Sequence, residues 1–375
     1  MVRFLDLHAQ YQSLKGEIDE AIARTIANST FIGGPDVTAF EQEFAVYQAA
    51  DHCVGVGNGT DAIEIAIEAL DLPAGSEVLV PANSFIASSE AVTRSGHRVV
   101  FCEADDRTYG IDLADAARRI TARTAAIMCV HLYGQPCDMD GVTTLAREHR
   151  LRVIEDSAQA HGAEYRGRRV GAIGDIGTFS FYPGKNLGAY GDAGAIVTND
   201  ADLAKKCRMI ANHGRIGKYD HEFEGRNSRF DGLQAAILRA KLPHLDDWID
   251  RRNQIARRYL DGLAGVEGLV LPEIANDVRH GFHLFVIRCA ERDRLQAFLK
   301  DHGIQAGIHY PIALPDLAAY EYLRGPDTPT RAGKNAGRLL SLPMGEHLAD
   351  EEVDRVIEAV RSFFAQADAR AQAVT

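Results

Sequence analysis

The segment Val153-Ile154-Glu155-Asp156-Ser157-Ala158-Gln159-Ala160-His161-Gly162 starts as an apolar run and becomes polar within a few residues. Short apolar runs of the same kind recur before and after it, at Cys53–Gly57, Glu77–Val80, Arg98–Cys102, Ala125–Val130, Arg152–Ile154, Gly177–Phe181 and Ala195–Thr198. Helix-period segments lie between them, and the one that opens at Asp61 carries an apolar stripe at Ile63, Ala66, Ile67 and Leu70. Apolar strands that alternate with helices predict the α/β class, with a mostly parallel sheet covered on both faces.

Beyond residue 228 the pattern changes. Residues 228–262 have helical spacing, and after them we expect a strand at Phe282–Arg288, a helix at Glu291–Asp301 and a final helix at Asp350–Ala369. The length of 375 residues is that of two domains. The sequence therefore predicts a large α/β domain at residues 1–245 and a smaller C-terminal α+β domain at residues 246–375.

The charge balance narrows the function. The chain has 41 Lys+Arg against 53 Asp+Glu, a formal charge of −12, which disfavours sequence-independent nucleic-acid binding and docking on anionic lipid. It has no apolar run long enough for a signal peptide or a bilayer span, and its six cysteines lack the spacing of a metal site. We expect a cytoplasmic protein with no metal, no nucleic-acid partner and no membrane partner.

Two glycine-rich segments imitate nucleotide-binding motifs. Gly55-Val56-Gly57-Asn58-Gly59-Thr60 would need a glycine at position 60 to match the dinucleotide fingerprint. Gly184-Lys185 resembles the end of a P-loop, but Gly177 lies too far upstream, and Asn186 replaces the hydroxyl residue that should hold magnesium. Both nucleotide interpretations fail on spacing.

Three features remain at predicted strand ends. The helix that begins near Thr60-Asp61 offers unpaired N–H groups to an anion, Asp156 follows a buried strand, and Lys185 lies in a Pro-Gly turn five residues after Ser180. Each alone has a simpler interpretation: a capped helix, a capping aspartate and a solvated lysine. Together they match pyridoxal 5′-phosphate (PLP), which needs donors for its phosphate, a carboxylate for its ring nitrogen and an amine for its aldehyde.

The chain resembles the PLP-dependent sugar aminotransferases of the DegT/DnrJ/EryC1/StrS family nearly from end to end. The most specific stretches are Asn58-Gly59-Thr60-Asp61-Ala62, Glu155-Asp156-Ser157-Ala158-Gln159, Phe181-Tyr182-Pro183-Gly184-Lys185-Asn186-Leu187-Gly188 and Asn227-Ser228-Arg229-Phe230-Asp231-Gly232-Leu233-Gln234-Ala235-Ala236. The resemblance implies fold type I, the aspartate aminotransferase fold.

The resemblance also implies roles for single residues. Lys185 would hold PLP as a Schiff base and shuttle the proton, Asp156 would pair with the ring nitrogen, Gln159 would contact the ring hydroxyl, and Phe85 would stack on the ring. The phosphate ligands would be Gly59, Thr60, Asp61 and Ser180, with Asn227 reaching in from a partner subunit. The implied assembly is a homodimer with shared active sites.

The stretch Asn227-Ser228-Arg229-Phe230-Asp231 is more similar to family members that aminate C3 of a nucleotide-linked keto sugar than to those that act at C4. On that resemblance Arg229, His309 and Tyr310 would contact the substrate. An intersubunit salt bridge for Arg229 and a rigid turn at His309-Tyr310 remain open. The family commonly has a leucine-histidine pair after this turn, whereas this chain reads Ala313-Leu314-Pro315, so contacts from that loop are not implied.

The predicted function is amino transfer from L-glutamate to a keto sugar linked to a nucleotide, at C3 of a dTDP- or UDP-3-keto sugar. A C4 aminotransferase of the same family is one alternative, and a PLP-binding regulator without catalysis is another. A sugar dehydratase on the same scaffold would carry histidine where this chain has Lys185.

Overall fold

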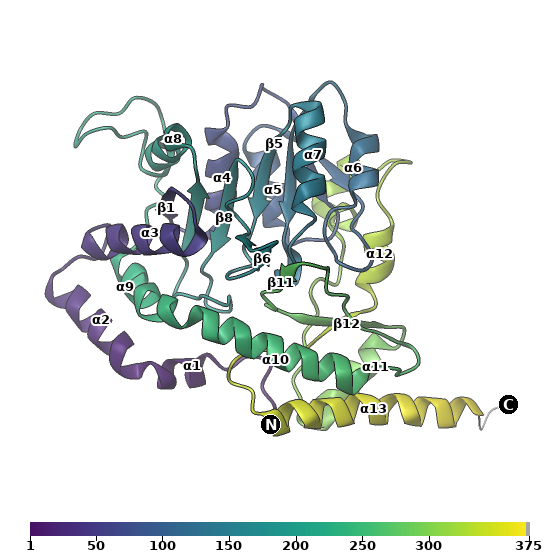
Figure 1. The fold of residues 1–375 in the computed structure, drawn as a ribbon. Helices are drawn as coiled ribbons and strands as arrows, with labels where there is room; N and C mark the ends of the chain where they lie inside the picture. Colours follow the sequence, from purple (N-terminus) through teal and green to yellow (C-terminus); the bar gives the residue numbers. More distant parts are fainter. Residues whose placement is uncertain (373–375) are drawn as a thin grey trace.

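A seven-stranded sheet forms the centre of the molecule in the computed structural model, which describes residues 1–372 (Figure 1). Its strand order is β1-β9-β8-β5-β4-β2-β3. The strands are β1 His52–Val56, β2 Glu77–Pro81, β3 Arg98–Cys102, β4 Thr124–Val130, β5 Arg152–Asp156, β8 Ile176–Ser180 and β9 Gly194–Thr198. Only β9 runs against its neighbours, so the expectation of a mostly parallel sheet is confirmed.

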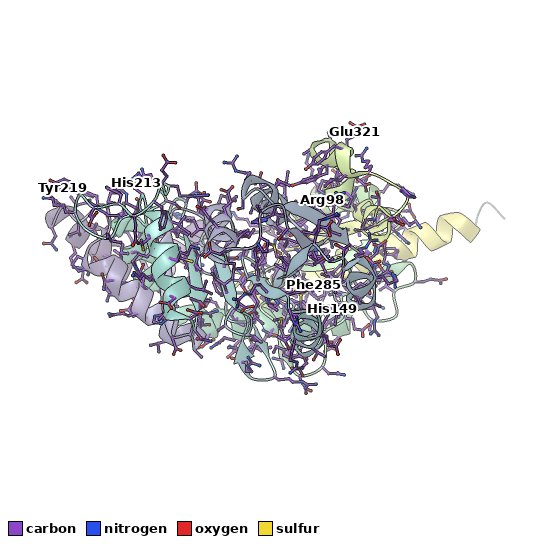
Figure 2. The ribbon with its side chains drawn as sticks, turned by 90° about the horizontal axis from the view of Figure 1, so that it is seen from above. Arg98, His149, His213, Tyr219, Phe285 and Glu321 are labelled. Atoms are coloured by element: carbon purple, nitrogen blue, oxygen red, sulfur yellow. The ribbon has the colours of Figure 1, made fainter. Side chains whose placement is uncertain are left out.

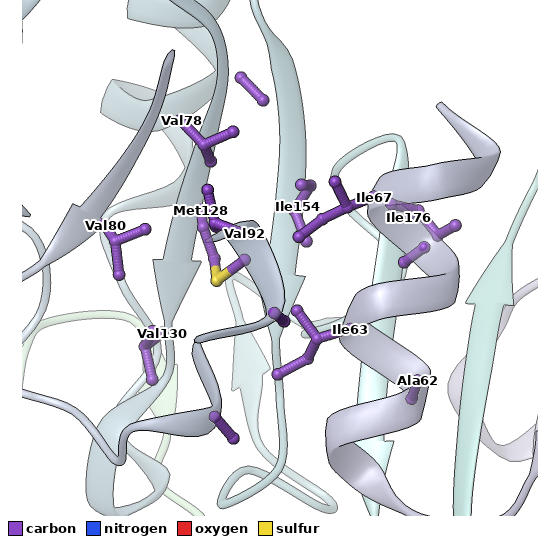
Figure 3. Close-up of a cluster of buried hydrophobic side chains, with 14 of the residues drawn as sticks. Ala62, Ile63, Ile67, Val78, Val80, Val92, Met128, Val130, Ile154 and Ile176 are labelled. Carbon is purple, nitrogen blue, oxygen red and sulfur yellow. The ribbon is translucent and has the colours of Figure 1, made fainter. Parts of the chain in front are cut away.

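Both faces of the sheet are buried, which explains why its strands are mostly apolar, with charged residues such as Arg98, Arg152 and Asp156 at their ends. Side chains alternate along each strand, so Val78 and Val80 of β2 face one helical layer and Leu79 faces the other. Figure 3 shows the first layer, where Ile63 and Ile67 pack against Met128 and Ile154 of the sheet.

Helices cover the sheet on its two faces. The structure contains α1 Leu7–Ser13, α2 Lys15–Ala27, α3 Pro35–Gln48, α4 Gly59–Ala69, α5 Ala87–Arg94, α6 Leu113–Arg119, α7 Met139–His149, α8 Ala201–Ala211, α9 Gly232–Lys241, α10 Leu245–Leu263, α11 Arg292–Asp301, α12 Arg331–Ala336 and α13 Asp350–Gln372. Residues of α4, α5 and α8 share one core with the sheet, and those of α6 and α7 share another on the opposite face. Residues of α3, α9 and the start of α10 complete that second face.

The segment after α9 crosses the molecule and leads into a second core. Helix α10 runs diagonally below the sheet in Figure 1 and packs on α13. A three-stranded sheet, β10-β12-β13, lies with α11 and α13 around this core; its strands are β10 Leu269–Val270, β12 Phe285–Cys289 and β13 Leu339–Leu342. The predicted boundary between residues 245 and 246 falls at the start of α10 and stays a prediction, and residues 373–375 of the predicted small domain lie outside the described residues.

Strand β12 begins three residues later than the predicted Phe282–Arg288. The backbone N–H groups of Gly281 and Leu284 donate to the carbonyls of Gly134 and Tyr133 in the first part of the chain. These bonds draw residues 281–284 toward the large sheet, because a strand pairing cannot use N–H groups that are already bound elsewhere.

A small three-stranded sheet has the order β11-β6-β7; its strands are β6 Glu164–Tyr165, β7 Arg168–Arg169 and β11 Val278–Arg279. All six cysteines are free and buried. No helix within residues 1–372 is both long and apolar enough to cross a membrane.

Candidate active site

A cavity of about 610 Å³ opens where the parallel strands end and the C-terminal part begins. The carboxyl ends of β2, β4, β5 and β8 meet at one sheet edge, and β1 points the same way because it is antiparallel to β9. Loops at that edge therefore converge, which is the usual ligand position in such sheets. The opposite wall comes from residues 283–284, 309–310 and 344.

The N-terminus of α4 forms one end of the cavity. The Asn58 side chain caps the helix by accepting the N–H of Asp61 at 2.8 Å, which leaves the first N–H groups, those of Gly59 and Thr60, free of helical partners. A Cβ on Gly59 would lie 2.5 Å from the Cβ of Ser180, so only glycine permits this close approach of α4 to β8. The result is an anion cradle of backbone donors beside a serine hydroxyl.

Asp156 lies at the end of β5 with 5% of its surface exposed. Its carboxylate accepts the Ser88 hydroxyl at 2.7 Å and the Ala158 N–H at 3.1 Å, and Ser84 approaches the Ser88 hydroxyl at 2.7 Å. Because a buried carboxylate needs such donors, the serine pair keeps Asp156 in place while it still lines the cavity.

Lys185 lies in the loop that follows β8. This loop folds back on itself, and a Cβ on Gly188 would come within 2.3 Å of the Pro183 carbonyl oxygen. The Lys185 side chain lines the cavity. Burial away from water lowers its pKa to about 8, although the negative charge of Asp156 acts in the other direction and raises it. An amine with a pKa near neutrality is partly unprotonated and can act as a nucleophile or a base.

Gln159 and Tyr310 form a polar wall. The Gln159 amide oxygen accepts the Tyr133 N–H at 2.7 Å, which directs the amide NH₂ group to the Tyr310 hydroxyl at 3.0 Å. Burial raises the pKa of Tyr310 to about 12, so its hydroxyl stays protonated and keeps its own hydrogen for donation. The rings of Phe85 and Tyr310 lie 5.7 Å apart, and half of the Phe85 surface is exposed.

His309 lies next to Tyr310 on the same wall. Burial, with a contribution from Lys185, lowers its pKa to about 4, so the ring is neutral at pH 7. Its Nδ1 lies 2.9 Å from the Ser341 hydroxyl. His309 thus presents a fixed, uncharged ring to the cavity.

Three of the predicted site residues do not line this cavity: Asp61, Asn227 and Arg229. The Asp61 N–H is used by Asn58, and its carboxylate lies toward Gly57. Asn227 and Arg229 are exposed on an extended segment.

Ser228 and Phe230 alternate with those two residues and point inward. The Ser228 hydroxyl accepts the Gly57 N–H at 3.0 Å, and the Phe230 ring occupies the space that a side chain at Gly55 would need. Ser228, which belongs to the stretch that resembles C3-aminating family members, is 2% exposed and holds this segment beside the start of α4.

The sequence reasoning missed several residues of the site, including Ser88, Tyr133, Arg252, His283 and Met344. His283 could have been found from the sequence, because a histidine is unusual inside an apolar run such as residues 282–288. Ser88 carried none, because it is one of two adjacent serines in an ordinary helix and only the fold brings it to Asp156.

The donor set fits PLP on geometry alone. The α4 cradle suits a phosphate, the buried Asp156 carboxylate suits a protonated ring nitrogen, and the Lys185 amine suits an aldehyde. When bound there, PLP would act as an electron sink for the carbanion that forms at an adjacent carbon. The arrangement defines a PLP-dependent enzyme of the aminotransferase type.

Comparison with known proteins places the chain within that class. Residues 12–361 match the model of the DegT/DnrJ/EryC1/StrS aminotransferase family, and the chain belongs to this family. It is therefore a transaminase of fold type I, and its cofactor is PLP, as the sequence predicted.

Individual relatives cover almost the whole chain. It is 46% identical over 368 residues, 98% of this chain and 97% of the relative, to dTDP-3-amino-3,4,6-trideoxy-alpha-D-glucose transaminase of Streptomyces venezuelae. It is 45% identical to dTDP-3-amino-3,6-dideoxy-alpha-D-galactopyranose transaminase of Aneurinibacillus thermoaerophilus, over 97% of this chain and 99% of the relative. The crystal structure of S. venezuelae DesV in complex with a ketimine intermediate superposes with a TM-score of 0.94 and 45% identity, over 97% and 98% of the two chains.

Proposed function

We propose that the protein transfers the amino group of L-glutamate to the C3 keto group of a dTDP- or UDP-linked sugar, in the biosynthesis of an amino sugar for a surface polysaccharide or a glycosylated natural product. The observation that carries this proposal is the near-complete coverage of two relatives at 45–46% identity whose names both describe 3-amino dTDP-sugars. The cavity supports it, because a phosphate cradle, a carboxylate and an amine lie around one space large enough for a cofactor.

In this proposal each part of the cavity has one task. Gly59, Thr60 and Ser180 hold the cofactor phosphate, Asp156 holds the proton of the ring nitrogen, and Gln159 contacts the ring hydroxyl. Phe85 stacks on the ring. Lys185 anchors the cofactor and then, as a free amine, moves a proton to and from the reacting carbon; its lowered pKa suits both roles.

Tyr310 and His309 contact the sugar. Both lie on the wall opposite the phosphate cradle, and both are uncharged at pH 7 because burial lowers the pKa of His309 to about 4 and raises that of Tyr310 to about 12. A neutral wall with hydroxyl and imidazole groups suits a polar, uncharged pyranose ring.

The active unit is a cytoplasmic homodimer whose sites are shared. Asn227 and Arg229 are exposed at the base of a loop that projects beyond α8, and Ile216, Tyr219 and Phe223 are exposed apolar residues on it. Figures 1 and 2 show this loop, with Tyr219 at the periphery of the molecule. Exposed apolar residues beside polar ones are typical of an interface, and a partner would bring its Asn227 to the phosphate and its Arg229 to the substrate.

The test is a pair of half-reactions followed by absorbance. The purified holoenzyme is treated with L-glutamate, which should convert PLP to pyridoxamine phosphate (PMP), and the glutamate is then removed. A nucleotide-linked 3-keto sugar or 4-keto sugar is added in separate samples. We expect the PLP absorbance to return with the 3-keto sugar only.

Return with the 4-keto sugar only would keep the transaminase chemistry and overturn the C3 assignment. Failure of glutamate to produce PMP would overturn glutamate as the donor. A regulator without catalysis would bind PLP and give neither conversion.

A further inference from the structure

Three buried polar side chains and one partly buried carboxylate, from separate segments, form a continuous hydrogen-bonded network that reaches the cavity at Arg252; we call it the Lys241–Arg252 network. Lys241, at the end of α9, donates to the Gly188 carbonyl at 2.7 Å and to the Gln10 amide oxygen at 3.0 Å. The NH₂ group of Gln10, on α1, donates to Glu346 at 2.7 Å, and Arg252 of α10 donates to the other Glu346 oxygen at 3.0 Å.

The two ends of this network reach opposite walls of the cavity. Gly188 belongs to the loop that carries Lys185, and the Lys241 ammonium also lies 4.2 Å from the centre of the Tyr190 ring at the end of that loop. At the other end, Arg252 donates to the carbonyls of Phe282 at 3.1 Å and Met344 at 3.4 Å. Those carbonyls belong to the two segments that bring His283 and Met344 to the cavity.

Burial of the charged groups of this network costs the fold free energy. Lys241 is fully buried and Arg252 is 2% exposed, and Glu346 pairs directly with Arg252 but reaches Lys241 only through Gln10. Burial lowers the pKa of Lys241 to about 8, which reports the cost of keeping its charge away from water. Because apolar side chains commonly replace buried ion pairs without loss of stability, stabilisation alone does not account for this arrangement.

We propose that Lys241, Gln10, Glu346 and Arg252 are positioning residues of the amino-transfer reaction, which set the distance between the Lys185 loop and the wall at residues 282–284 and 344. The inference rests on the proposed function. Proton transfer by Lys185 requires its amine and the reacting carbon of the bound substrate to meet within a narrow range of distance. The Lys185 loop packs into one core through Leu187 and Ala189, whereas Phe282 and Met344 of the wall pack into another.

Gln10 is the residue to substitute, because its uncharged side chain connects Lys241 to Glu346. In Gln10→Leu, Lys241 keeps the Gly188 carbonyl and Arg252 keeps Glu346, but the connection between the walls is lost. At saturating L-glutamate we expect the rate of PMP formation to fall about tenfold, since small displacements of reacting groups have effects of this size or larger. Hydrogen exchange of the holoenzyme should rise in both walls, at residues 182–190 and 280–284.

Gln12→Leu is the matched control, since Gln12 lies on the same helix and is exposed. It should leave the rate and both exchange patterns unchanged. Gln10→Asn, whose side chain is too short to reach both partners, is the second variant if Gln10→Leu does not fold, and it should behave as Gln10→Leu does.

A Gln10 variant with the wild-type rate and wild-type exchange at both walls overturns the proposal. So does a variant whose exchange rises only around residue 10. A wild-type enzyme that gives no PMP from glutamate would instead overturn the proposed donor, and the exchange of the two walls would then decide on the network by itself.

Discussion

The Lys185 end of the cavity is surrounded by residues of its own chain, whereas the polar side chains of the segment Arg226–Phe230 are not. Around Lys185, the α4 cradle, Asp156 and Gln159 all come from the same sheet edge and face one space. The segment Arg226–Phe230 is equally well anchored, because Arg226 pairs with Glu64 and Glu68 of α4, but its Asn227 and Arg229 face outward.

This difference indicates that the two regions act in different subunits. In a monomer, the fixed position of this segment would serve no site, because Asn227 and Arg229 do not line the cavity of their own subunit. Ser228 accepts the N–H of Gly57 just before α4, and Arg226 pairs with Glu64 and Glu68 farther along it. A partner that covers Asn227 and Arg229 would therefore sit beside the helix whose N-terminus faces the cavity. The comparison predicts that the first region acts within its own subunit and the second across the dimer.

The strongest change removes the amine itself. Lys185→Ala should slow PMP formation from L-glutamate by roughly 10³-fold, because the proton then has no positioned carrier. Single-turnover absorbance measures the rate, and Lys205→Ala, which removes an exposed lysine of α8, is the control and should react at the wild-type rate. A Lys185→Ala rate close to wild type would mean that another group carries the proton.

The second test measures the amine of Lys185 in the PMP form of the enzyme, where it is free. Its pKa is lowered to about 8 from an ordinary value of 10.5, so its unprotonated fraction should rise through pH 8 and not through pH 10. At pH 7 this makes its unprotonated fraction on the order of 10² times that of an ordinary lysine, and acetic anhydride modifies only the unprotonated form. Mass spectrometry of the Lys185 peptide against pH gives the midpoint, and a midpoint near 10 would contradict the desolvated site.

The third test separates the two regions by subunit. Asn227→Ala should weaken cofactor binding about tenfold or more, the usual loss for a hydrogen bond to a charged group. The activity is assayed at a cofactor concentration too low to load Asn227→Ala by itself. When Asn227→Ala is co-expressed with Lys185→Ala, about half of the dimers are mixed and each has one intact site, so activity should recover to about a quarter of wild type.

Recovery occurs only if Asn227 acts on the partner's Lys185. If Asn227 serves its own subunit, every site in a mixed dimer lacks one residue and activity stays at the level of the single variants. The mixed sample alone therefore decides between the two arrangements.

The smallest effect is expected at Ser228. Ser228→Ala leaves the Gly57 N–H without its acceptor and should lower the free energy of unfolding by about 1 kcal/mol. The preference between 3-keto and 4-keto sugars should not change, because Ser228 is buried and does not line the cavity. Denaturant unfolding measures the first quantity and the absorbance assay the second; a reversed preference would show that this position controls regiochemistry.

Much of the fold could be predicted because local pattern and burial agree. The apolar runs became strands of the large sheet within one or two residues of their predicted bounds, since strands buried on both faces are mostly apolar. The error at β12 arose where a long-range contact overrode the local pattern, as residues 281–284 pair with Tyr133 and Gly134 instead of extending the strand.

By itself, the sequence determined the class of chemistry. Asp156, Lys185 and the start of α4 each carry a local signature next to a strand, and parallel strands bring their carboxyl ends to one edge whatever lies between them. That is why PLP and the transaminase family could be recognised from separate short motifs.

Only the tertiary structure decided what surrounds those residues. It brought Ser88 to Asp156 and Tyr310 to Gln159, turned Ser228 inward and Asn227 outward, and joined Lys241 to Arg252 through Gln10 and Glu346. None of these pairs is close in sequence. Their contacts depend on how layers and loops pack, and short-range patterns hold no information about which distant side chain will fill a given space.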